Sequence, residues 1–143
     1  MAALDTAIVQ QIKNDAILAP LLLRSGSDYH IYPDAIPTNF LEEGDTDAAY
    51  LVYNEINTFY KQRFAYMMTT IQFSIFAHKK SKAVAVREAL LDVFHRFQAG
   101  TLGSGSNTRK VEFVWAKSSN SLKDKDSEMY MVTVDCAFKH REE

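Results

Sequence analysis

The stretch Thr70-Ile71-Gln72-Phe73-Ser74-Ile75-Phe76 decides the fold class, because apolar and polar residues alternate along it. In an extended strand Ile71, Phe73 and Ile75 point to one side, and the polar residues between them point to the other. One buried face and one polar face are typical of an antiparallel sheet that is covered on a single side. We therefore expect a strand over residues 67–78 in such a sheet.

Three further strands and a long helix can be placed around this stretch. The strands are expected at residues 49–57, 109–117 and 128–139. The helix is expected from Ser81, as its N-cap, to Phe97, with Gly100 closing it. Its apolar residues share one arc of the helical wheel: Ala83, Val86, Ala89, Leu90, Val93, Phe94 and Phe97. These elements predict an α+β fold in one domain over residues 1–143: a mainly antiparallel, four- to five-stranded sheet with helices packed on one face.

The alternation also predicts which residues of the last two strands share a face. In the strand at 109–117 we expect Val111, Phe113 and Trp115 on one face. In the final strand the buried face is expected to hold Tyr130, Val132, Val134, Cys136 and Phe138. Cys136 is the single cysteine, so we interpret it as a small buried apolar side chain rather than a reactive thiol.

The sequence of the first third of the chain predicts helix followed by an extended crossover segment. The apolar spacing of Leu4, Ile8 and Ile12 predicts a helix over residues 4–14. Pro20 suits the first position of a second helical turn. The two prolines of the segment Ile31–Pro37 force extended backbone before them, which predicts a crossover along the surface.

Three segments are expected to be loops. Residues 58–66 lack the tight-turn dipeptides, which predicts a long aromatic hairpin loop. Residues 100–107 are rich in glycine and serine and read as a flexible connector. Residues 118–127 are polar and of mixed charge, which is typical of a surface loop.

Composition excludes several functional classes. The formal net charge of −2 argues against a generally basic nucleic-acid binder but leaves room for a local basic patch, and we expect no specific nucleic-acid binding. No apolar stretch approaches the roughly 20 residues that a membrane-spanning helix needs. The first residues carry no basic cluster followed by an apolar core, so we expect no signal peptide.

The sequence carries no recognisable catalytic or metal-binding motif. The histidines at 30, 78, 95 and 140 are not in metal-ligand spacing, and we interpret His95 and His140 as surface residues. The glycines after residue 100 follow a helix, the reverse of a phosphate-binding loop. Glu112 and Asp135 could approach each other on the open face of the sheet, which leaves a hydrolase as the weakest hypothesis. The sequence predicts no enzyme, cofactor or metal.

Charge is distributed in blocks. An acidic block comprises Glu42, Glu43, Asp45 and Asp47. A basic block comprises His78, Lys79, Lys80, Lys82 and Arg87, with Lys79, Lys80 and Lys82 as the leading candidates for pairing, and the hairpin adds Lys61 and Arg63. Such blocks can simply be solvated surface. Alternatively, unlike patches on opposite flanks pair head to tail between identical subunits, and such contacts close into rings where the rotation permits.

The hairpin loop is a second candidate interface. It carries Phe59 and Tyr60 beside Lys61 and Arg63, where a simple turn would be polar. Aromatic and arginine residues are enriched at interface hot spots. The alternative is that the aromatic residues fold back onto the edge of the sheet.

The order of these elements resembles the tail-completion, or tail-terminator, proteins of long-tailed bacteriophages. The resemblance rests on Leu4–Ile8, the Tyr-Pro segment Ile31–Pro37, Leu51–Tyr53, residues 70–76 and Asp135–Phe138. It implies a subunit of a ring, typically hexameric, that caps the finished tail tube and joins it to the head connector. The implied partners are further copies of the chain, the tail tube protein and a head-completion or connector protein. The implied location is the virion, after assembly in the host cytoplasm.

A function of another class stays open beside this one. A dimeric α+β module that binds a small ligand or acts in regulation would have the same elements, with the ligand between helix and sheet. Stoichiometry separates the two hypotheses, because the first predicts a ring and the second a stable dimer.

Overall fold

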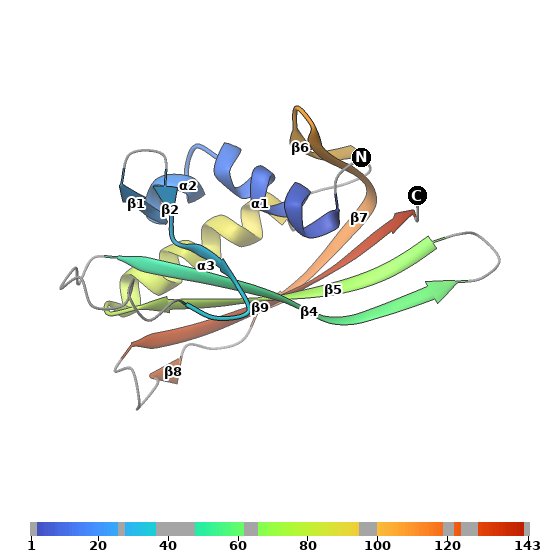
Figure 1. Cartoon of the computed structure of the whole chain (residues 1–143). Helices are drawn as coiled ribbons and strands as arrows, with labels where there is room; N and C mark the ends of the chain where they lie inside the picture. The colour runs from blue at the N-terminus through green and yellow to red at the C-terminus, as the bar shows by residue number, and fades with distance from the viewer. Residues whose placement is uncertain are drawn as a thin grey trace.

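The structure, a computed structural model, describes residues 3–25, 28–36, 48–61, 66–94, 100–118, 122–123 and 129–141. Within these residues three helices lie over one face of a large sheet (Figure 1). The helices are α1 (Leu4–Asn14), α2 (Leu18–Leu21) and α3 (Lys80–Phe94). None of the helices described is long and apolar enough to cross a membrane.

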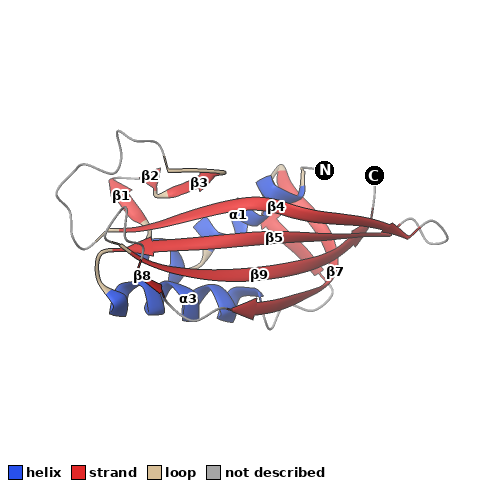
Figure 2. Ribbon diagram, turned by 90° about the horizontal axis from the view of Figure 1, so that it is seen from below, coloured by secondary structure: helices blue, strands red, loops and turns tan. Residues whose placement is uncertain are grey.

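The sheet has seven strands in the order β3-β4-β5-β9-β7-β6, with β8 beside β9. Their bounds are β3 (Ile31–Pro33), β4 (Ala49–Lys61), β5 (Tyr66–Ala77), β6 (Gly100–Ser104), β7 (Asn107–Ser118), β8 (Leu122–Lys123) and β9 (Tyr130–Arg141). A separate two-stranded sheet pairs β1 (Leu23–Ser25) with β2 (Asp28–Tyr29). In Figure 2, seen from below, β4, β5 and β9 run side by side, and α1 lies partly behind β4. The predicted α+β class is confirmed.

The sheet is larger than predicted and is mixed. The expected crossover contains the short strand β3, which pairs in parallel with Leu51–Tyr53 of β4. All other pairs in the sheet are antiparallel. Pro33 is tolerated because β3 is an edge strand, where a missing backbone donor leaves no ladder bond unmade.

The hairpin of β4 and β5 is longer than predicted. The two strands pair from Ala49 opposite Ala77 to Lys61 opposite Tyr66. The expected loop over residues 58–66 was therefore wrong at both ends, because its β-branched and aromatic residues favour strand backbone. Residues 62–65, between the strands, lie outside the described part of the chain.

The expected connector at residues 100–107 is a hairpin. Gly100–Ser104 forms β6, which pairs with the start of β7. Gly105 has a φ of 59° and Gly103 a φ of 83°, both in the region that glycine adopts at no steric cost. The glycines thus shape a tight antiparallel turn rather than a flexible connector.

A β-bulge changes the faces of β7. The pairing with β9 shifts between Val111 and Phe113. The extra residue brings both Val111 and Val114 to the buried face, so the predicted simple alternation of residues 111, 113 and 115 was wrong. The side chains of Phe113 and Trp115 are not among those described.

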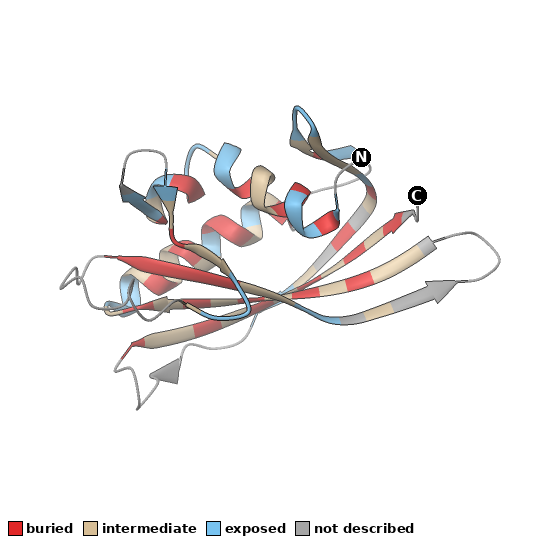
Figure 3. Cartoon of the chain, in the orientation of Figure 1, coloured by how far each residue is buried: buried red, intermediate tan, exposed pale blue. Residues whose placement is uncertain are grey.

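The main core lies between the helices and the sheet (Figure 3). The predicted alternation is confirmed in β5 at Ile71, Phe73 and Ile75. In β9 it is confirmed at Val132, Val134, Cys136 and Phe138, while Tyr130 is half-buried. The buried residues of the helices are Leu4, Ala7, Ile8 and Ile12 in α1 and Ala83, Val86, Ala89, Leu90 and Phe94 in α3.

Two predicted helix ends differ from the structure. Helix α3 begins at Lys80, so Ser81 lies inside its first turn instead of capping it, and the helix is described to Phe94. Residues 95–99, including His95, lie outside the described residues. Pro20 is the third residue of α2 rather than the first, a position where the missing N–H is still one that an α-helix leaves unbonded.

A second, smaller core lies on the opposite face of the sheet, at one end. Tyr50 alternates with the core residues Ala49 and Leu51, so its ring packs on the face away from the helices. The members of this cluster are Ala48, Tyr50 and Met129, with Tyr32, Ile36 and Phe76 against them. The buried His30 ring contacts Tyr50 at a centroid distance of 4.4 Å, and its Nδ1 lies 2.7 Å from the Tyr32 hydroxyl.

Candidate functional site

A cleft of about 420 Å³ lies between the first residues of α1 and the sheet. Its walls come from α1, from the end of β3 and from β4, β5, β7 and β9, which are distant in the sequence. Its polar lining comprises Asp5, Asp34, Tyr53, Asn54, Glu55, Thr69, Arg109 and His140. The fold thus assembles a concave site from segments that carry no common sequence motif.

A hydrogen-bonded imidazole forms part of this lining. His140 and Thr69 are each 2% exposed. Arg109 Nη2 lies 3.1 Å from His140 Nδ1, and a guanidinium can only donate, so Nδ1 is the acceptor. The proton is therefore on Nε2, which donates to Thr69 Oγ1 at 2.8 Å. The expectation that His140 is a surface residue was wrong, because β9 continues to Arg141 and holds the ring beside β5 and β7.

The hydrogen bonding continues across the sheet to β4. The hydroxyls of Thr69 and Thr58 lie 3.3 Å apart, and Thr58 donates to Glu55 Oε1 at 2.9 Å. A row of polar groups thus crosses β7, β9, β5 and β4 and ends on a carboxylate at the side of the cleft. This row fixes the rotamers of the side chains that line it.

Three carboxylates set the charge of the cleft. Asp5, Asp34 and Glu55 are all exposed residues on its lining. Burial raises the pKa of the Tyr53 hydroxyl, and the negative charges of Asp5 and Asp34 raise it further, which reflects how near they lie. Among the described residues of the lining, three carboxylates face one guanidinium, that of Arg109, so this lining carries a net negative charge.

Asp34 holds an uncommon backbone conformation at the side of the cleft. Its φ is 64°, a left-handed value that aspartate and asparagine adopt more readily than most residues. Its backbone N–H donates to the carbonyl of Tyr53 at 3.0 Å, which ties the turn after β3 to β4. Sequence reasoning missed this cleft because its three carboxylates come from separate segments, each an ordinary surface residue in its own surroundings.

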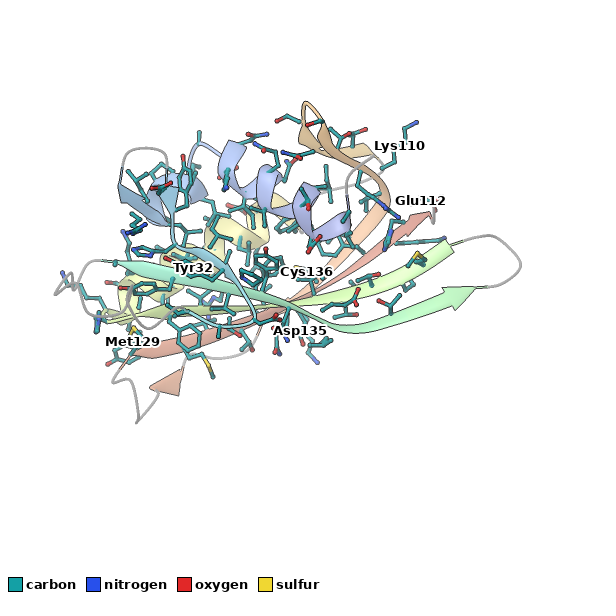
Figure 4. The ribbon with its side chains drawn as sticks, in the orientation of Figure 1. Tyr32, Lys110, Glu112, Met129, Asp135 and Cys136 are labelled. Atoms are coloured by element: carbon teal, nitrogen blue, oxygen red, sulfur yellow. The ribbon has the colours of Figure 1, made fainter. Side chains whose placement is uncertain are left out.

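The proposed carboxylate pair does not form. Glu112 lies in the bulge of β7, and its Oε2 is 3.4 Å from Nζ of Lys139. Asp135 stands opposite Gln72 and Lys117 in the strand register, and Figure 4 shows it well apart from Glu112. Register, which a single strand does not reveal, separates the two carboxylates. The geometry needed by the hydrolase hypothesis is therefore not present.

Cys136 is fully buried in the main core, as the sequence predicts. Burial raises the pKa of its thiol to about 12, and the neighbouring charge of Asp135 contributes. The thiol is therefore uncharged and poorly nucleophilic at neutral pH. Among the described residues no group of three or more His, Cys, Asp or Glu side chains could hold a metal ion.

The predicted interface residues are only partly described. Lys79 and Lys80 are exposed and Lys82 is half-buried, at the start of α3. Phe59, Tyr60 and Lys61 belong to β4, but their side chains are not described. Glu42, Glu43, Asp45, Asp47 and Arg63 lie outside the described ranges. Pairing of the acidic block with the lysines stays a prediction.

Comparison with known proteins gives one informative result. No protein-family model and no curated protein sequence matches this chain. Among solved structures, it is similar to a chain in the virion of a native gene transfer agent particle, with a TM-score of 0.69 and 19% sequence identity. The match covers 98% of this chain and 96% of that one. The two chains therefore share one fold over their whole lengths.

Proposed function

We propose that this protein is a structural subunit of a phage-like virion. The observation that carries the proposal is the end-to-end likeness to a chain of the gene transfer agent virion. Because the match covers 98% of this chain and 96% of that chain, the likeness extends over both folds rather than over a shared fragment. A role as a virion component, rather than an enzyme, also agrees with the sequence analysis, which identified no catalytic motif.

Within the virion, the protein closes the finished tail tube as a ring, most simply a hexamer, and joins the tail to the head connector. This finer assignment rests on the resemblance to tail-completion proteins in sequence. Its partners are further copies of itself, the tail tube protein and a head-completion or connector protein.

The test is to delete the gene in a strain that produces the particle and to examine the products by electron microscopy. A protein that terminates the tube leaves free heads and tubes of uncontrolled length when it is absent. A neighbouring neck protein leaves unjoined tails of normal length. Normal, joined particles from the deletion strain would contradict a role in the virion, and wild-type gene supplied in trans is the control.

The cleft favours one alternative function, a dimeric module that binds a small ligand between helix and sheet. A volume of about 420 Å³ lies within the range of small-molecule pockets. Light scattering on the purified protein separates the two functions. The virion role predicts a ring, or a monomer that assembles on tubes, whereas the binding module predicts a stable dimer.

A further inference from the structure

The start of α3 concentrates positive charge where a helix favours negative charge. Lys80 and Lys82 lie in its first turn and Lys79 directly precedes it, and that turn holds no acidic residue. The N-terminal end of a helix carries a partial positive charge, so lysines there repel it and an outside anion is attracted. This end of the molecule is therefore suited to an anionic partner.

The cleft at the start of α1 has the opposite character. Its three carboxylates outnumber its one guanidinium, and Arg109 already donates to His140. An ammonium group entering the cleft would find acceptors from three different segments. Charge alone thus makes the cleft and the start of α3 complementary.

The two surfaces lie at opposite ends of the molecule. Figure 1 shows α3 beginning at the left end of the helical layer and α1 beginning at the right, and Figure 2 agrees. Lys80 of one copy therefore cannot reach the cleft of the same copy. A contact between two different surfaces is heterologous, and repeated copies of it form a ring or an open filament.

We infer that the cleft lined by Asp5, Asp34 and Glu55 receives the lysines at the start of α3 from a second copy of this chain. The inference rests on the proposed ring and names the contact that links its neighbouring subunits. It places the acidic partner of the lysines in the cleft rather than in the acidic block at residues 42–47. Exposed charge pairs are weak, so each should change the association constant by no more than about fivefold.

Two variants remove one surface each. The cleft variant combines Asp5→Asn, Asp34→Asn and Glu55→Gln, which removes charge while keeping size and hydrogen-bond acceptors. Asparagine also tolerates the positive φ at position 34. The lysine variant combines Lys80→Glu and Lys82→Glu, and glutamate is favourable in the first turn of a helix. Both variants are therefore expected to fold, which circular dichroism checks.

Mixing the variants tests whether the contact is head to tail. Each variant alone should associate about 5- to 100-fold more weakly than the wild type, measured by native mass spectrometry over a concentration series. The cleft variant keeps its lysines and the lysine variant keeps its cleft. In a mixture, these two intact surfaces can still bind each other. The mixture should therefore give one-to-one dimers that grow no further. Wild-type assembly by both single variants would overturn the inference and leave the proposed function standing.

Disulfide cross-linking tests the contact directly, whatever the assembly state. Protein carrying Glu55→Cys is mixed with protein carrying Lys80→Cys, under mild oxidation at high concentration. The control pairs Lys80→Cys with Lys13→Cys, an exposed position in the last turn of α1. The buried thiol of Cys136 adds little background, because burial raises its pKa to about 12. A yield no higher than that of the control pair would overturn the inference.

Two further outcomes replace the inference with another partner or function. If the lysine variant assembles normally but loses binding to duplex DNA in a gel-shift assay, the anion at α3 is a phosphate backbone rather than a second copy. If the wild type forms a closed dimer whose cross-links do not involve position 55 or 80, both the contact and the proposed ring are wrong.

Discussion

Replacing Phe94 should test the core that joins helix to sheet. Its side chain is 0% exposed. The ring stacks on Phe73 of β5 at a centroid distance of 5.7 Å and meets Phe138 of β9 edge-on at 5.5 Å. Phe94→Ala removes both contacts at once and leaves a cavity between α3 and the two central strands.

The expected loss of stability follows from these contacts. Burying a phenylalanine contributes about 1.5–3 kcal/mol, and each favourable aromatic pair adds about 0.5–1.5 kcal/mol. Together with incomplete collapse of the cavity, the free energy of unfolding should fall by about 3–5 kcal/mol. For a chain of this length, each kcal/mol of lost stability lowers Tm by roughly 3–4 °C, so Tm should fall by about 10–20 °C.

Chemical denaturation monitored by circular dichroism measures this loss. Phe94→Leu keeps an apolar side chain but not the ring contacts, so it should fall between the wild type and Phe94→Ala. Ile17→Ala is the control, because Ile17 is 70% exposed and should change stability by about 0.5 kcal/mol or less. A loss from Phe94→Ala no greater than that of the control would refute the aromatic core.

Three further results are expected. Thr69→Val leaves the buried imidazole N–H without its acceptor, so unfolding free energy should fall by about 1–3 kcal/mol in denaturant titrations, and no change would contradict the hydrogen-bonded row. Gly103→Ala places a Cβ in collision with the backbone oxygen of Asn107, whereas Gly105→Ala meets nothing within 4 Å. The first should therefore lower Tm far more, and equal shifts would refute the turn geometry. Folding raises the pKa of the Cys136 thiol from 9.0 to about 12, so the unfolded state loses the thiol proton at a lower pH than the folded state does. The contribution of Cys136 to the free energy of unfolding should therefore decline as pH rises from about 9 to 12. A Cys136→Ala variant should lack that part of the pH dependence.

The alternation of apolar and polar residues was sufficient to predict the buried faces of the central strands. Residues 70–76 and the final strand each show one continuous apolar face, and both faces are buried as expected except at the half-buried Tyr130. The same reasoning failed at β7, because a bulge depends on the neighbouring strand and leaves no mark in the strand itself. It failed at β6 because glycine and serine have low strand propensity, while pairing with β7 and contact with α1 hold that segment extended.

The candidate site was harder to predict than the fold. The cleft joins Asp5, Asp34 and Glu55 through tertiary packing, whereas a sequence reveals only charges that are clustered along the chain. The lysines at the start of α3 drew attention because they are close together in sequence, and their role at an interface stays a prediction. His140 was misassigned because the buried face of β9 ends in a polar residue, whose partners Thr69 and Arg109 come from other strands.

The position of β9 has a consequence for how the protein is made. β9 lies between β5 and β7 and pairs with both, yet it follows every other strand of the sheet in the chain. Until the ribosome has synthesised residue 130, β5 can pair only with β4, and β7 can pair only with β6. Long-range pairing of this kind is slow, and unpaired strand edges promote aggregation. A prematurely terminated chain therefore cannot complete the sheet, which keeps truncated products out of any assembly that requires the folded subunit.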